Sequence, residues 1–154
     1  ADKEKHTLEH FEMSEYDLMK MSPFRWIDLF GDNSLRMAMG FDGFVGVANT
    51  SELSIAFGKA TGRGGQLRVL SVGAPTQATA AADDFLREIE EGEAAKKTRR
   101  WLNQIPSQKQ VDHLRRQGIE VSAFDLSWTK YKAACMLNFM WNKFVIEKAV
   151  EKHL

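Results

Sequence analysis

The chain has 154 residues, of which 44% are hydrophobic and 27% charged, and its formal net charge is zero. These values are typical of a globular protein with one domain or two small ones. The sequence has no apolar run long enough to span a bilayer and no signal-peptide pattern. We therefore expect no membrane association and a cytoplasmic location. The single cysteine, Cys135, excludes an internal disulfide and a thiolate-rich zinc site.

Residues 1–11 form a polar N-terminal segment, and because the chain begins with Ala1 rather than methionine we expect a processed or excised fragment. His6 and His10 belong to an HxxEH pattern that is typical of inverted zinc peptidases. A catalytic zinc also needs a third ligand and an ordered set of supporting groups, for which this segment has no obvious core. We therefore interpret the segment as a linker and predict no metal site.

The next part, residues 12–92, is predicted to be a β-meander with flanking helices. A short acidic helix within 12–21, which Ser14 can cap, comes before an apolar stretch at 23–30 that we interpret as a strand or tight turn. Apolar residues then recur with a period of two, which predicts half-buried antiparallel strands. These strands are expected over 35–41, 44–48, 53–58 and 67–72, with Asp42 and Gly43 as a two-residue hairpin turn.

A helix is expected to start at Pro75 and to continue until Gly92 interrupts it. Its apolar residues recur at helical spacing and predict one buried face. The acid pairs along it point about 100° apart, so they cannot converge on a metal, and we interpret them as a solvated face. These pairs are Asp83 with Asp84 and Glu90 with Glu91.

The last part, residues 93–154, is predicted to be a helical basic subdomain, either separate or packed as one domain with the preceding part. A helix over 93–102 is expected to end before Pro106, because the residue before a proline leaves the α region. Ser107 and Gln110 then form a capping box, and Gly118 supplies the left-handed stop, which predicts a short helix over about 108–117.

Positive charge is concentrated around this short helix: residues 94–118 contain seven lysines and arginines against one acid, Asp112, in a chain that is neutral overall. A basic face on a capped helix indicates contact with phosphates, since neutralising phosphates releases counterions whatever the base sequence. The other interpretation is an ordinary solvated helix.

Two further features leave alternatives open. A glycine-rich hairpin tip beside Lys59 and Arg63 is either a flexible turn or a second place of backbone contact with phosphate. Trp101 and Trp128, which flank the short helix, are either lids on the core or platforms for an unpaired base. The predicted nucleic-acid-binding residues are Lys96, Lys97, Arg99, Arg100, Trp101, Lys109, Arg115, Arg116, Lys59 and Arg63.

A long helix, opened by Ser127 or Thr129, is expected to run toward Lys152. It is apolar on nearly all sides, so it is either buried or partly covered by something outside this chain. One predicted face consists of Ala134, Leu137, Trp141, Val145 and Ala149. The surplus of apolar surface favours an alternative function, a protein–protein docking module.

Motifs for catalysis are missing from the sequence. The phosphate-loop pattern GxxxxGK[ST] and the dinucleotide pattern GxGxxG do not occur, and no acid, base and nucleophile converge. We therefore predict that the chain is not an enzyme and needs no cofactor.

Two stretches of the sequence, residues 22–59 and 99–137, together carry a resemblance to a known family. The second contains PSQKQVDHLRRQGI followed by LSWTKYKAACML, which is similar to a recurrent element appended to helicases and some other DNA enzymes. The two stretches together resemble the C-terminal accessory region of phage and bacterial superfamily-two (DEAD/DEAH-like) helicases. The resemblance implies a parent protein that binds ATP and translocates on nucleic acid. The motor motifs themselves are absent here, so no catalytic residue is carried over.

The predicted fold is α+β, a four-stranded antiparallel β-meander packed against C-terminal helices. The predicted function is a non-catalytic accessory domain of a helicase that binds DNA, single-stranded or duplex, through its phosphates. Sequence specificity is expected to be low, because no set of side chains resembles a major-groove reading set. In the alternative, the module docks on the helicase motor domains or on a phage or host partner.

Overall fold

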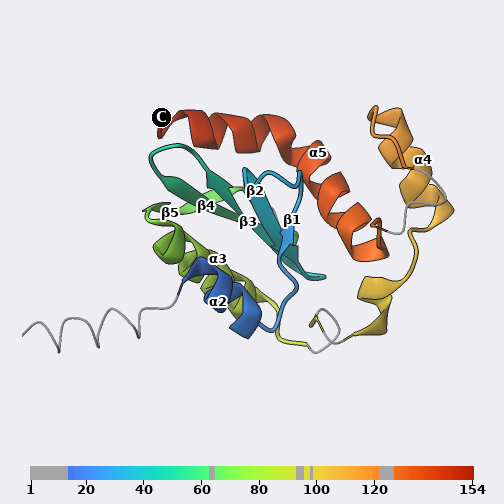
Figure 1. Cartoon of the computed structure of the whole chain (residues 1–154), viewed down its shortest axis with the longest axis horizontal. Helices are drawn as coiled ribbons and strands as arrows, with labels where there is room; N and C mark the ends of the chain where they lie inside the picture. Colours follow the sequence, from blue (N-terminus) through green and yellow to red (C-terminus); the bar gives the residue numbers. More distant parts are fainter. Residues whose placement is uncertain (1–13, 63–64, 93–95, 98, 122–126) are drawn as a thin grey trace, which may run out of the picture.

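The computed structural model describes residues 14–62, 65–92, 96–97, 99–121 and 127–154, which form an α+β fold. Figure 1 shows the helices and strands along the chain. The helices are α2 (Glu15–Met21), α3 (Pro75–Ile89), the 3-10 helix η1 (Arg100–Asn103), α4 (Gln108–Arg116) and α5 (Lys130–Glu151). The strands are β1 (Ile27–Asp28), β2 (Leu35–Met39), β3 (Gly43–Asn49), β4 (Ser54–Ala60) and β5 (Arg68–Gly73).

The strands form one antiparallel meander in the order β1-β2-β3-β4-β5. The predicted meander is confirmed for β2 to β5, but the count of four strands is wrong. The additional strand, β1, pairs Ile27 with Met37 and Asp28 with Arg36. Two residues are too few to show an alternating pattern, which is why the sequence left this stretch as either a strand or a tight turn.

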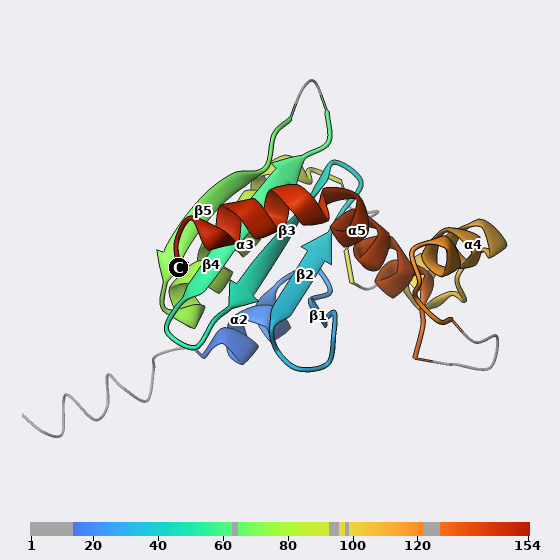
Figure 2. The same cartoon turned by 90° about the horizontal axis from the view of Figure 1, so that it is seen from above.

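Helices cover both faces of the sheet, with α2 and α3 on one side and α5 on the other (Figures 1 and 2). Along β2, Met37 belongs to the core cluster beneath α5, whereas Ala38 belongs to the cluster beneath α3. The prediction that the sheet packs against C-terminal helices is therefore incomplete, because α3 precedes them and covers the opposite face. Strands buried on both faces read as continuous apolar runs, as β3 and β4 do.

The turn between β2 and β3 lies one residue earlier than predicted. Gly40 donates its amide N–H to the carbonyl of Gly43 at 2.9 Å, so Phe41 and Asp42 form the loop rather than Asp42 and Gly43. The carboxylate of Glu90 accepts the amide N–H of Asp42 at 2.6 Å and holds the turn in this position.

Local signals for the helix ends are confirmed. The Ser14 hydroxyl accepts the amide N–H of Asp17 in a capping box, and Thr129 accepts the amide N–H of Lys132 at the start of α5. The helix predicted over 93–102 is wrong: residues 93–95 and 98 lie outside the described residues, and the rest is a bend, a turn and η1. The amide N–H of Lys97 donates to the carbonyl of Pro23, which takes the backbone out of a helical ladder.

One buried side chain joins α5 to the sheet. The hydroxyl of Tyr131, fully buried, donates to the carbonyl of Arg25 at 2.7 Å and accepts the amide N–H of Met39 at 2.8 Å. Burial raises the pKa of this hydroxyl well above its ordinary value, so it stays protonated. Across the described residues, the helices are too short or too polar to cross a membrane.

Candidate nucleic-acid interface

The short basic helix α4 is built by local signals. The Ser107 hydroxyl accepts the amide N–H of Gln110 at 3.2 Å, while the Gln110 side chain accepts the amide N–H of Ser107 at 3.0 Å. Gly118, with φ of 81°, ends the helix in the left-handed region. Leu114, fully buried, and Val111 anchor α4 on the core cluster that includes α5.

The cations of α4 lie on its outward side. Lys109 and Arg116 are seven residues apart, about two helical turns, so they share one face of the helix with His113. Arg115 points elsewhere and donates to the carbonyl of Val121 at 2.9 Å. In both cartoon views α4 lies at one end of the molecule, beyond the first turns of α5 (Figures 1 and 2).

The α4 cations are not neutralised by neighbouring carboxylates. Within the described ranges, Lys109, Arg115 and Arg116 make no ion pair, and the ion pairs present lie on α3 and α5. The one acid of the helix, Asp112, accepts a hydrogen bond from Gln108 at 2.9 Å instead. Within the described residues, the exposed cations Lys109 and Arg116 of α4 are therefore not paired with a carboxylate.

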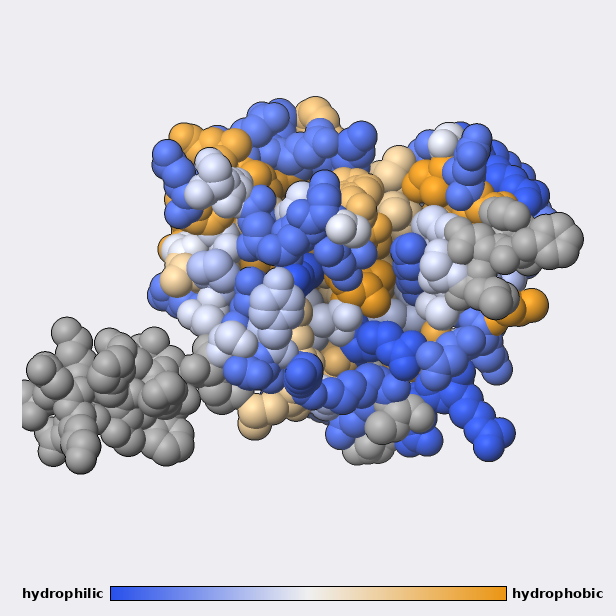
Figure 3. All heavy atoms as spheres, viewed as in Figure 1, coloured by the Kyte–Doolittle hydropathy of each residue, from blue (hydrophilic) through white to orange (hydrophobic). Residues whose placement is uncertain are grey.

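The cations before Pro106 lie in two other places. Lys96 and Lys97 are half-buried against the connection between α2 and β1, where the Lys97 ammonium contacts the carbonyl of Lys20. Arg99 and Arg100 are exposed at the start of η1, on the chain segment between that connection and α4. Figure 3 shows hydrophilic surface over α4 and along the lower edge of the molecule toward η1.

Of the two remaining predicted cations, Lys59 and Arg63, only Lys59 lies within the described residues. Lys59, on β4, donates to the side-chain carbonyl of Asn142 at 3.0 Å and so ties the sheet to α5. Arg63 lies outside the described residues. The same is true of His6 and His10, and the described residues contain no group of acids, histidines and cysteine that could hold a metal ion.

The two tryptophans that flank α4 pack into the protein. Trp101 is half-buried, with its ring centroid 5.4 Å from that of Phe41 and 5.7 Å from that of Tyr131. Trp128 is 8% exposed and belongs to the core beneath α5, with the Lys132 ammonium 4.5 Å from its ring centroid. The burial of Trp128 agrees with its interpretation as a lid on the core, whereas Trp101 is only half-buried.

Trp141, which the sequence placed on an apolar face of the long helix, is an exposed tryptophan beside α4. Trp141 is 62% exposed, and its ring meets the His113 ring edge to face with centroids 6.2 Å apart. It lines a cavity of about 330 Å³ together with Lys109, His113 and Asn138. No sequence signal separates Trp141 from the buried residues of α5, because apolar residues occur on nearly all sides of this helix.

Titration of buried groups adds no catalytic chemistry to this surface. Burial raises the pKa of the Cys135 thiol, which therefore stays protonated and inert in the core. Among the described residues, this surface combines exposed cations, the imidazole of His113 and the exposed indole of Trp141.

Residues 6–154 match one protein family, described as the C-terminal domain of the mitochondrial helicase Irc3. No curated protein and no solved structure matches the chain. The match covers nearly the whole chain, so it confirms the helicase part of the resemblance, but it gives no support to a phage or bacterial origin. It also shows that the expected cytoplasmic location is wrong, since the family is that of a mitochondrial helicase and points to mitochondria.

Proposed function

Because the chain belongs to the family of the mitochondrial helicase Irc3 C-terminal domain, we propose that it holds nucleic acid for the motor domains of its parent protein through phosphate contacts made by α4. The observation that carries this proposal is the exposed pair Lys109 and Arg116 on one face of α4, whose cations make no ion pair with a described carboxylate. Neutralisation of phosphates by such side chains is favourable because it releases condensed counterions.

The proposed contacts have low base selectivity. Lysine and arginine on a phosphate backbone fix position and carry no sequence information. Arg99 and Arg100 extend the contact from the η1 side, and Arg115 supports it from the end of α4. ATP binding and hydrolysis are assigned to the motor domains, since this chain contains none of their motifs.

Salt-dependent binding tests the proposal. Fluorescence anisotropy with labelled single-stranded, duplex and forked DNA should give an affinity that falls as the salt concentration rises. Lys109→Ala with Arg116→Ala should weaken binding and reduce the salt slope by roughly 0.9 for each lost duplex phosphate contact. The matched control, Lys143→Ala with Lys152→Ala, removes the same charge from exposed positions on and next to α5. Absence of binding at low salt, or equal loss in both double variants, would refute the proposal.

A second candidate function is supported by the exposed face of α5. Phe144 is 68% exposed and Val145 is 49% exposed, next to the exposed Trp141, so this stretch of the helix leaves apolar surface uncovered. Such a patch is typical of a docking surface, and here the partner would be the motor domains of the same protein. Phe144→Ser should weaken binding of separately produced motor domains in a titration, whereas Lys152→Ser should not. Equal affinities for the two variants would exclude this surface.

A further inference from the structure

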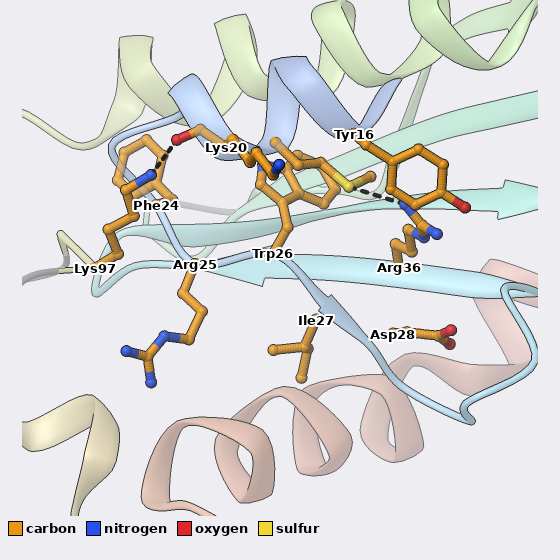
Figure 4. A pocket seen from close by; sticks show the side chains of 10 residues that line it. Tyr16, Lys20, Phe24, Arg25, Trp26, Ile27, Asp28, Arg36 and Lys97 are labelled. Atoms are coloured by element: carbon orange, nitrogen blue, oxygen red, sulfur yellow. Dashed lines mark hydrogen bonds between the residues drawn. The ribbon is translucent and has the colours of Figure 1, made fainter. Parts of the chain in front are cut away.

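An open pocket of about 390 Å³ lies between α2 and the β1–β2 edge of the sheet, on the face opposite α5 (Figure 4). Its volume is within the range of small-molecule sites. The side chains that matter for its chemistry are Tyr16, Lys20, Trp26, Arg36 and Lys97. Tyr16 and Lys20 lie on α2, and Arg36 lies on β2. Trp26 comes directly before β1, and Lys97 precedes η1.

Arg36 is a buried cation without an anionic partner among the described residues. Its residue is 7% exposed, its guanidinium lies 4.3 Å from the centroid of the Tyr16 ring, and one nitrogen contacts the sulfur of Met19 at 3.1 Å. Its Nε atom is buried with no hydrogen-bond partner among the described residues. Arginine keeps its charge in proteins, and a buried charge without an opposite charge is costly.

The one acid among the described lining residues does not compensate this charge. Asp28 stands opposite Arg36 in the strand register, but its carboxylate accepts the amide N–H groups of Gly31 and Asn33, each at 3.0 Å. No ion pair joins Asp28 to Arg36. The electrostatic balance of the pocket therefore stays positive.

The indole N–H of Trp26 is a second buried donor without an acceptor among the described residues. Its indole Nε1 is buried without a hydrogen-bond partner in the described part of the chain. A buried indole N–H normally finds an acceptor, and an unsatisfied buried group points to a missing ion, water or ligand. Both unsatisfied atoms of the described lining, Arg36 Nε and Trp26 Nε1, are donors that call for an acceptor, and Lys20 and Lys97 add two positive charges.

We infer that this pocket binds one nucleotide of an unpaired strand, with its phosphate toward Arg36 and its base against an aromatic wall, while the ammonium groups of Lys20 and Lys97, farther along the pocket, add to its positive charge (Figure 4). The Tyr16 ring is suited to stacking, because the side chain is 53% exposed and Arg36 occupies only one of its faces. Single-stranded nucleic acid is bound by this combination of aromatic rings and cations. The inference rests on the proposed function and adds a site for unpaired strands distinct from α4.

The Trp26 indole N–H gives a direct readout by NMR, and Trp26→Phe assigns its cross-peak. Titration with thymidine monophosphate and with a single-stranded thymidine oligonucleotide should shift this cross-peak, whereas thymidine without phosphate should not. A shift with the free nucleotide but none with the oligonucleotide overturns the assignment to a strand. A shift of equal size with N-acetylglutamate overturns the nucleotide class and favours an acidic peptide. No shift with any probe overturns the site.

Variants separate this inference from the proposed function. Lys20→Gln, at an exposed position, and Arg36→Gln should each weaken single-strand binding, by about tenfold for Arg36, and leave binding to blunt duplex unchanged. Lys152→Gln removes one charge on the opposite face and should change neither. Thermal melting of each variant shows whether it folds, and Lys20→Gln tests the site if Arg36→Gln does not.

Failure of the pocket inference and failure of the proposed function would give different results. If the pocket variants bind single strands as the unaltered chain does while the α4 double variant is impaired, the pocket inference is wrong and the proposed function stands. If no nucleic acid binds to the unaltered chain, both are wrong.

Discussion

The carboxylate of Glu90 closes the turn between β2 and β3 from the end of α3. It accepts the amide N–H of Asp42, and the residue is only 7% exposed. A Cβ atom on Gly40 would lie 2.1 Å from this carboxyl group, so the carboxylate fits only because residue 40 is glycine. Burial raises the pKa of Glu90 above its ordinary value of 4.5, and the hydrogen bonds from the turn amides oppose the shift in part.

We expect Glu90 to make the protein less stable as the pH rises. Its pKa is higher in the folded protein than in the unfolded chain, so between the two values the folded state holds a proton that the unfolded state has lost. Its stabilising contribution is therefore complete below the unfolded-state pKa and is lost as the pH rises through the folded-state pKa. Glu90→Gln should remove this part of the pH dependence.

Urea denaturation of both proteins from about pH 4 to about pH 7 measures this effect as the difference between their free energies of unfolding. A difference that stays constant with pH would contradict the assignment. Asp84→Asn, at an exposed position on α3, is the control and should leave the pH profile unchanged.

Burial of individual acids could not be predicted from the sequence. Asp83 and Glu90 were expected on a solvated face, but both residues are only 7% exposed. Asp83 accepts the Ser22 hydroxyl and the Arg87 guanidinium, and the partner of Glu90 lies 48 residues away in the sequence. Adjacent acids on a helix do point apart, as predicted, but what faces each of them is set by the tertiary fold.

At the scale of elements, helix ends that are set by residues close together in the sequence could be predicted, whereas elements that depend on tertiary contacts could not. The capping box of α4 and the glycine that ends it were read correctly because their hydrogen bonds join residues three or four apart. The helix expected over 93–102 was not, since the amide of Lys97 bonds to Pro23, far away in the chain, and the stretch of β1 was left open as a strand or a tight turn. The sequence named the face of α5 that carries Trp141 but could not tell which part of it is exposed, because apolar residues occur on nearly all sides of this helix.

The cap of α4 should control both its stability and its binding. Ser107→Ala removes the acceptor for the amide N–H of Gln110 and should destabilise the helix by about 1 kcal/mol. Fraying of α4 would also spread the cations of Lys109 and Arg116, so affinity for duplex DNA should fall. Hydrogen exchange of the α4 amides together with anisotropy measures both effects.

Ser107→Asn is the matched control for this change, because asparagine caps helices about as well as serine and adds no charge. It should retain both protection and affinity. If Ser107→Ala leaves the exchange of the α4 amides unchanged, the cap is not what holds the helix.

At the scale of the whole molecule, the basic end is joined to the sheet by one core. The cluster beneath α5 contains Met37 from β2, Leu102 from η1, Leu114 from α4 and Tyr131 from α5. The division expected at residue 93 therefore crosses a continuous apolar core, and we propose that the two parts unfold together. A sheet covered by helices on both faces needs this last layer, because without α5 the apolar side chains of one face would be exposed to water.

Leu114→Ala should show this coupling. Leu114 is fully buried, so its truncation should lower the free energy of unfolding by about 2–5 kcal/mol. Because α4 and the sheet share one core, the Trp141 and Trp26 indole signals should be lost together in one urea transition. This should hold in the variant and in the unaltered chain alike. Val69→Ala on the partly exposed β5 should cost much less. Loss of the Trp141 signal at a lower urea concentration than the Trp26 signal would instead show that the basic end unfolds on its own.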